Sequence, residues 1–225
     1  MKKEFVCLIF SCLMVLSLLL VSCNTTPEPL PSLDTTPPSV KDEAKGEKSE
    51  YIETVNQWSS YKDVASWMKE NYAFDRDRQM VIQREVLPQI QQADLEAIDQ
   101  VTKEAWSTPG ILQSAEETFG IKHGHCADAA QFAIDALNRI NPEYNARFVF
   151  VTNSQGNPHH HVTGFTMNGE IYIMDFGAGP NWSAMNGVHG PYSTLSDYEE
   201  FLLSLDIKSF TLAGARWLPY GWPRD

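Results

Sequence analysis

The spacing of apolar residues changes at Asn141-Pro142, and this change restricts the fold more than any other feature of the chain. Over Tyr51–Trp106, and again over Cys126–Ile140, apolar residues recur every three or four positions, which predicts amphipathic helices. Beyond Pro142, β-branched and aromatic residues dominate, which predicts strands. Helices followed by strands are typical of an α+β domain, so we expect N-terminal helices packed on an antiparallel β-sheet.

Turn and cap residues place the boundaries of these elements. In the helical part, Pro88 is expected to end one helix, Ala93–Trp106 to form another, and Ser107-Thr108-Pro109 to open a third that runs toward Phe119-Gly120. The expected strands are Arg147–Thr152, His160–Met167, Glu170–Phe176 and Ser209–Trp217. Asn168-Gly169 is typical of a tight hairpin turn, so the second and third strands should be antiparallel neighbours.

The N-terminus has the pattern of an export signal. Two lysines precede the apolar run Phe5–Val21, which at about 17 residues is borderline for a membrane span, so an uncleaved anchor is the alternative. Leu20-Val21-Ser22-Cys23 resembles the bacterial lipobox, in which the cysteine is lipidated before cleavage. We therefore expect a signal peptide at 1–22, a lipidated Cys23, a disordered Pro/Thr-rich tether over 23–50 and an exported, membrane-anchored domain over 51–225 at the bacterial cell envelope.

Charge and cysteine content limit the partners and the chemistry. The 225-residue chain has a formal net charge of −12, which disfavours nucleic acid as a partner. Cys7 and Cys12 leave with the expected signal and Cys23 carries the lipid, so Cys126 is the only thiol left in the mature domain. An internal disulfide is excluded on this reading.

Three residues of the domain have the chemistry of nucleophilic cysteine catalysis, which requires a thiolate, a base and a group that orients the base. Cys126 stands at an expected helix N-terminus, where the macrodipole favours an anion. His161 opens one strand of the predicted hairpin and Asp175 ends the other. Because both are about equally far from the turn, we expect them to lie side by side, while His160 points to the opposite face.

The sequence around these residues resembles the transglutaminase-like superfamily of papain-fold enzymes, and in particular its bacterial cysteine proteinases. The resemblance covers about Trp106–Asp175 and rests on Trp106-Ser107-Thr108-Pro109, Gly124-His125-Cys126-Ala127-Asp128-Ala129-Ala130, His161-Val162-Thr163-Gly164-Phe165 and Asp175. It implies a papain-like fold and a Cys126–His161–Asp175 triad that acts on an amide bond of a peptide or protein substrate through a thioester.

Some features depart from that group and bear on the details. His125 and Ala127 replace the acidic residues that usually flank the nucleophile and that some members use to bind calcium, so no cofactor is expected. His125 is instead a candidate for tuning the thiol. The second oxyanion donor, beside the Cys126 N–H, has Gln113 and Trp106 as candidates. The histidine strand lacks the Trp and Glu of many true transglutaminases, which disfavours crosslinking.

Other interpretations use the same residues. Cys126 also belongs to an alanine-rich helix face, where a cysteine packs as a small apolar side chain. A zinc site from Cys126, a histidine of the run 159–161 and Asp175 is a further alternative. The aromatic segment Trp217–Trp222 either packs on the sheet or lines a substrate cleft. The domain is accordingly a thiol hydrolase, a dormant module that binds a peptide or cell-wall fragment, or an amide or acyl transferase.

Overall fold

The computed structural model describes residues 50–91, 98–155 and 159–223. The expected signal peptide at 1–22, the lipidated Cys23 and the tether up to residue 49 lie outside these residues. Within the three described stretches, no helix is both long and apolar enough to cross a membrane.

Helices make up most of the first half of the described chain, and strands most of the second half. A short helix at 50–55 is followed by α2 (Tyr61–Asn71), α3 (Arg76–Glu85), α4 (Leu87–Gln91), α5 (Ile98–Ser107), α6 (Ala115–Ile121) and α7 (Cys126–Ile140), and α8 (Leu195–Ser204) comes late in the chain. The strands are β1 (Ala73–Phe74), β2 (His123–Gly124), β3 (Arg147–Asn153), β4 (His160–Met167), β5 (Glu170–Asp175), β6 (Gly187–Tyr192) and β7 (Leu212–Trp217). Two 3-10 helices are η1 (Pro142–Tyr144) and η2 (Pro180–Met185).

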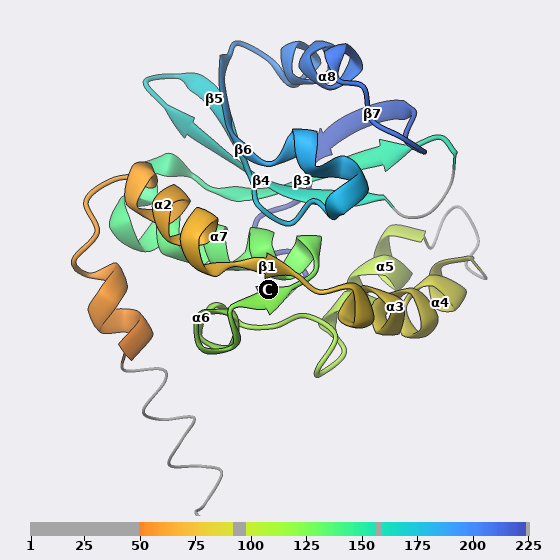
Figure 1. Ribbon diagram of the computed structural model, residues 1–225, viewed down its shortest axis with the longest axis horizontal. Coiled ribbons are helices and arrows are strands. Elements are labelled where there is room, and N and C mark those ends of the chain that lie inside the picture. Colours follow the sequence, from red (N-terminus) through yellow and green to blue (C-terminus); the bar gives the residue numbers. More distant parts are fainter. Residues whose placement is uncertain (1–49, 92–97, 156–158, 224–225) are drawn as a thin grey trace, which may run out of the picture. The chain divides into compact units, whose positions relative to one another are not determined.

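A five-stranded antiparallel sheet separates two layers of helices. Its strand order is β6-β5-β4-β3-β7, and a two-stranded parallel pair, β1-β2, lies apart from it. Figure 1 shows α8 on one side of the large sheet, with α2 and α7 on the other. This arrangement confirms the expected α+β fold of helices packed on an antiparallel sheet.

Helix α7 begins and ends where the sequence predicts. His125 is its N-cap, and it forms a capping box with Asp128, while the helix ends before Asn141-Pro142. Its alanines allow close contact with the sheet, and the Thr163 hydroxyl of β4 donates to the Ala130 carbonyl oxygen (3.0 Å). The Cys126 end of α7 is thereby held against one end of the sheet.

The two faces of the sheet have separate apolar cores. Phe165 and Met174 face the α7 side and pack with Phe132 and Leu137 of that helix. On the opposite face, Val162 and Ile173 pack with α8 through its Tyr198 and Leu202. Alternate residues along β4 thus belong to different layers, and this alternation determines which way each histidine points.

Several parts of the described chain differ from the sequence prediction. Pro88 does not end a helix: α3 ends at Glu85, and Pro88 is the second residue of α4. Ser107-Thr108-Pro109 does not open a helix: α5 ends at Ser107, and α6 starts at Ala115, because Ser114 and Glu117 form a capping box there. Strand β6 and helix α8 were not predicted. The last strand begins at Leu212 instead of Ser209.

Candidate active site

Cys126 is the first residue of α7 and is partly exposed as a whole residue, while its thiol is buried. The turn after β5 passes directly against it. A Cβ added at Gly177 would lie 2.5 Å from the Cys126 Cα and 3.1 Å from its carbonyl oxygen. The backbone after Asp175 therefore approaches the nucleophile as closely as it does only because residue 177 is glycine.

Replacing Gly177 by alanine is expected to lower the free energy of unfolding by about 1–3 kcal/mol, because the new methyl group meets backbone that cannot rotate away. It should also slow alkylation of Cys126, because the new methyl group would displace the backbone of that residue. Denaturant unfolding and iodoacetamide labelling measure the two effects. Gly179→Ala is the matched control, because its Cβ meets only the movable ring of Phe74 at 3.2 Å. Equal effects of the two variants would contradict the proposed contact.

His160, and not His161, is the histidine paired with Asp175. Its Nε2 lies 2.6 Å from Asp175 Oδ2, and both side chains are buried. Oδ1 of the same carboxylate accepts from the Gly177 N–H (3.0 Å). The predicted side-by-side placement of His161 and Asp175 is therefore wrong.

The register of the β4–β5 hairpin explains this correction. Met167 pairs with Glu170 and Thr163 with Met174, so, continuing this register, Asp175 lies opposite Val162. Because side chains alternate along a strand, Asp175 shares its face with Val162 and His160. The predicted pairing of 161 with 175 was displaced by one residue, and a displacement of one residue exchanges the two faces.

His161 lies on the α7 side, within a group of aromatic rings. Trp222 stacks on it with a centroid distance of 5.3 Å and an interplanar angle of 16°, and Trp106 meets it edge-on at 5.1 Å. Phe148 and Phe150 of β3 complete its surroundings. Among the residues that the structure describes, no carboxylate pairs with His161 as Asp175 pairs with His160.

The electrostatics of the site favour a thiolate–imidazolium pair. Burial by itself would raise the pKa of the Cys126 thiol, but hydrogen bonding to His160 and His161, together with the charges of His160 and His125, holds it well below its ordinary value. Burial by itself would lower the pKa of His160, yet Asp175 and the Cys126 sulfur raise it to about 10. The pKa of His161 is lowered, chiefly by burial, so this ring is neutral at pH 7.

A second buried ion cluster holds the N-terminus of α7. The Asp128 carboxylate accepts from Arg78 Nε (2.5 Å) and Nη2 (3.0 Å), and from the backbone N–H groups of Gln113 (2.8 Å) and His125 (3.0 Å). Its Oδ2 also lies 2.7 Å from His125 Nδ1. Asp128 thus joins α3 and the segment that precedes α6 to the first turn of α7, two residues after the nucleophile. Arg78 was not singled out from the sequence, because only the fold brings it to Asp128.

Gln113 and Trp106, the predicted oxyanion or cleft residues, have different surroundings. In the orientation that satisfies both ends of its amide, Gln113 donates to the His123 carbonyl oxygen (3.2 Å) and to Thr118 Oγ1 (3.1 Å). Both hydrogens of that amide are then used, which argues against Gln113 as the oxyanion donor. The Trp106 ring packs against the rings of both His125 and His161, with centroid distances of 5.3 Å and 5.1 Å, and its role remains a prediction.

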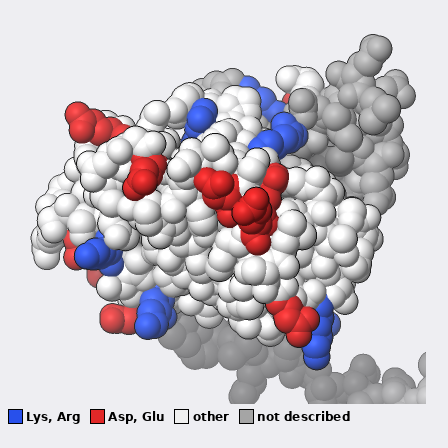
Figure 2. Space-filling model, turned by 90° about the horizontal axis from the view of Figure 1, so that it is seen from above, with Lys and Arg blue, Asp and Glu red and all other residues white. Residues whose placement is uncertain are grey.

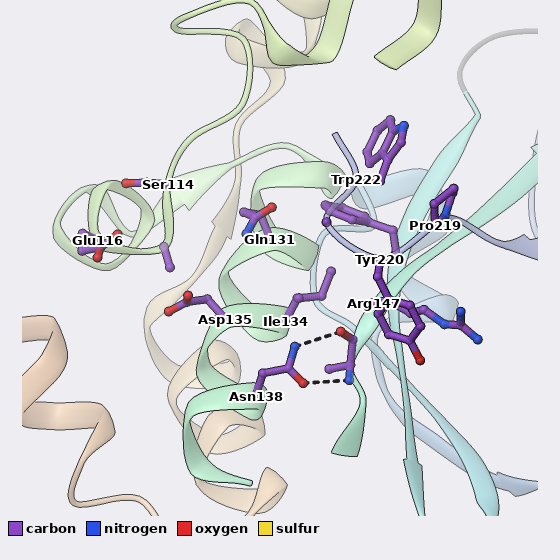
Figure 3. A pocket seen from close by; sticks show the side chains of 14 residues that line it. Ser114, Glu116, Gln131, Ile134, Asp135, Asn138, Arg147, Pro219, Tyr220 and Trp222 are labelled. Carbon is purple, nitrogen blue, oxygen red and sulfur yellow. Dashed lines mark hydrogen bonds between the residues drawn. The ribbon is translucent and has the colours of Figure 1, made fainter. Parts of the chain in front are cut away.

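A cavity of about 310 Å³ adjoins this group of rings (Figure 3). Its lining includes Gln131, Ile134 and Asp135 of α7, Glu116 of α6, Arg147 and Phe148 of β3, and residues 219–222 of the C-terminal tail. Trp222 lines the cavity and also stacks on His161, so one indole ring separates the two. The aromatic tail therefore packs on β3 through Phe148, which is one of the two alternatives left open by the sequence, and it also borders this cavity.

Among the described residues, no group of three or more His, Cys, Asp and Glu side chains is placed to hold a metal ion. On the face drawn in Figure 2, several acidic side chains gather near the middle, whereas basic ones are scattered. This distribution is in keeping with the net charge of −12.

The fold and the placement of Cys126, His160 and Asp175 together have the form of a papain-like domain. A family model described as "Transglutaminase-like domain" matches residues 46–182, which include α7 and strands β3 to β5. The chain therefore belongs to the transglutaminase-like family. No curated protein matches the chain.

Proposed function

We propose that this domain is a thiol-dependent hydrolase that cleaves a peptide, isopeptide or related amide bond. Cys126 is the nucleophile, His160 its acid and base, and Asp175 the residue that orients His160. The observation that carries the proposal is the buried 2.6 Å contact between His160 and Asp175, beside the buried thiol of Cys126, whose pKa is lowered by hydrogen bonding to His160. Membership of the family supports the fold on which this chemistry depends.

The roles follow from which ring atoms are free. His160 Nε2 is committed to Asp175, so Nδ1 is the nitrogen available to the Cys126 sulfur. The thiolate attacks the carbonyl carbon of the amide, and the π electrons of the carbonyl move onto its oxygen. The Cys126 N–H, at the N-terminus of a 15-residue helix, stabilises that oxyanion.

Collapse of the tetrahedral intermediate breaks the carbon–nitrogen bond. The His160 imidazolium gives its proton to the departing amine, which leaves a thioester on Cys126 and a neutral imidazole. That imidazole then takes a proton from water as the water oxygen attacks the thioester carbon. The acid leaves, and the thiolate and imidazolium are restored.

The test of this function is the reaction of the full chain with p-nitrophenyl acetate. The wild type should release a burst of p-nitrophenolate and acquire one acetyl group on Cys126, identified by peptide mass spectrometry. Cys126→Ala should lose both signals while its circular dichroism stays unchanged. A wild type with no burst and an unreactive thiol would overturn the proposal in favour of a dormant binding module.

Transfer to an amine uses the same thioester and is the second candidate for this site. It differs only in the group that attacks the thioester, so added hydroxylamine distinguishes the two by forming acetohydroxamate in place of acetate.

For the location, we propose the bacterial cell envelope, with a lipid on Cys23 as the membrane anchor. The support for this location is the export signal and lipobox-like sequence at residues 1–23.

A further inference from the structure

The oxyanion of the proposed reaction needs a second donor besides the Cys126 N–H. His125 immediately precedes the nucleophile and is 2% exposed. Its Nδ1 lies 2.7 Å from Asp128 Oδ2, an interaction within the N-terminal cap of α7. The other nitrogen of the ring, Nε2, lies across the ring from this contact and therefore points away from the end of the helix.

Nε2 of His125 is one of two buried side-chain polar atoms, among the described residues, that have no hydrogen-bond partner. A buried polar atom without a partner is unusual in a folded protein, because it has lost its hydration and gained nothing in return. A substrate atom that accepted a hydrogen bond there would remove this cost.

The protonation of the ring decides whether Nε2 can donate. If Nδ1 accepts from the Asp128 N–H (3.3 Å), the neutral ring carries its hydrogen on Nε2. If Nδ1 instead donates to the Asp128 carboxylate (2.7 Å), the imidazolium also carries a hydrogen on Nε2, whereas the neutral ring has only a lone pair there. Burial by itself lowers the pKa of His125, but Asp128 more than offsets this and the pKa is raised, which favours the second form.

The surroundings of the ring place it at the reacting centre. The ring centroid of Trp106 lies 5.3 Å from that of His125 and 5.1 Å from that of His161, so one indole packs against both imidazoles. The charge of His125 also lowers the pKa of both Cys126 and His161, so its ring lies within electrostatic range of the sulfur.

We propose that His125 Nε2–H is the second oxyanion donor of the site, a role that would make His125 a catalytic residue as well as a helix cap. The inference rests on the proposed function. When the sulfur–carbon bond forms, the substrate oxygen gains the electron pair of the carbonyl π bond and accepts hydrogen bonds from Cys126 N–H and His125 Nε2–H. No proton is transferred in this interaction, and both bonds are weaker again once the carbonyl is restored.

Two substitutions separate this role from capping and from tuning of the thiol. His125→Asn keeps an oxygen that can cap α7 but has no donor at the position of Nε2, whereas His125→Gln places an amide N–H near that position. Two reactions of the full chain are compared on the pH plateau of each variant. Acylation by p-nitrophenyl acetate passes through an oxyanion, whereas alkylation by iodoacetamide does not.

We expect His125→Asn to slow acylation about 100-fold, a typical loss for one oxyanion donor, while alkylation on the plateau changes less than about threefold. His125→Gln should recover part of the acylation rate. If both reactions slowed equally, His125 would act only by tuning the Cys126 thiol. If acylation were unchanged, His125 would act only as the N-cap of α7. Either result overturns the inference. Slowing by Trp106→Phe and not by His125→Asn would assign the donor to Trp106. If the wild type itself is not acylated on Cys126, it is the proposed function that fails.

Discussion

Replacing His160 by alanine is expected to remove most of the reactivity of Cys126 at mildly acid pH. In the wild type the pKa of the thiol is well below its ordinary value and that of His160 is about 10, so the ion pair persists across neutral pH. Without His160, burial still raises the pKa of the thiol, and the hydrogen bond from His160, which lowers that pKa most, is lost. Alkylation at pH 6 should therefore fall about 10- to 100-fold, since a thiol with an ordinary pKa of about 8.5 is almost fully protonated there.

The measurement is the rate of iodoacetamide alkylation between pH 4 and pH 11. In the wild type this rate should rise at low pH, as the thiol ionises, and stay level through neutral pH. Turnover of an acyl substrate should fall again as pH rises through about 10, where the imidazolium loses its proton. His161→Ala is the matched control: the ring is adjacent and also bonds to the sulfur, but it has no carboxylate partner. A larger loss in His161→Ala than in His160→Ala would restore His161 as the base.

The difference between these two histidines shows how far the sequence could predict the site. The hairpin, its Asn168-Gly169 turn and the approach of a histidine to Asp175 were predictable from local turn chemistry. The face could have been predicted too, because a two-residue turn at Asn168-Gly169 pairs Met167 with Glu170, and counting back along both strands places Val162 opposite Asp175. Asp175 then shares its face with His160 and not with His161. The prediction was wrong because it counted 161 and 175 as equally far from the turn.

Long-range partners were beyond the reach of sequence patterns. Asp128 was predictable as a residue of the first turn of α7, because capping is local. Arg78 has no such signal, since it lies 50 positions away and reaches Asp128 only when the N-terminus of α3 is joined to β2, just before α7, through the Asp75 N–H and the Gly124 carbonyl oxygen. Helix α8, in contrast, had a usable signal. Thr194 and Asp197 form a capping box before a periodic apolar stretch, and this pattern predicts a helix start.

Removing the Asp128 carboxylate is expected to have the largest effect on stability. In Asp128→Ala, Arg78 and His125 lose their buried partner, and the N–H groups of Gln113 and His125 lose their acceptor. Loss of one member of a buried ion pair typically costs about 3–5 kcal/mol, so the free energy of unfolding at pH 7 should fall by about that amount. Alkylation of Cys126 should slow as well, because the same carboxylate holds the N-terminus of α7.

The pH dependence of this effect has a definite sign. Burial by itself would raise the pKa of Asp128, but His125 and Arg78 hold it far below its usual range. A carboxyl whose pKa is lowered by folding stabilises the fold fully above its unfolded pKa of about 3.9, and this stabilisation is lost as pH falls through the folded value. The difference between wild type and Asp128→Ala, measured by urea unfolding, should therefore be complete at pH 7 and shrink below about pH 4.

Asp197→Ala provides the control, because Asp197 has the same position in the capping box of α8 but accepts only from backbone N–H groups at the surface. It should cost about 1 kcal/mol or less, in the range of a lost helix cap. If the two aspartate variants destabilised the protein equally, Asp128 would contribute only a cap, and its contacts with Arg78 and His125 would add nothing. A larger loss in Asp128→Ala, together with slower alkylation of Cys126, would instead mean that this buried cluster holds the nucleophile against the end of the sheet, where His160 and Asp175 meet it.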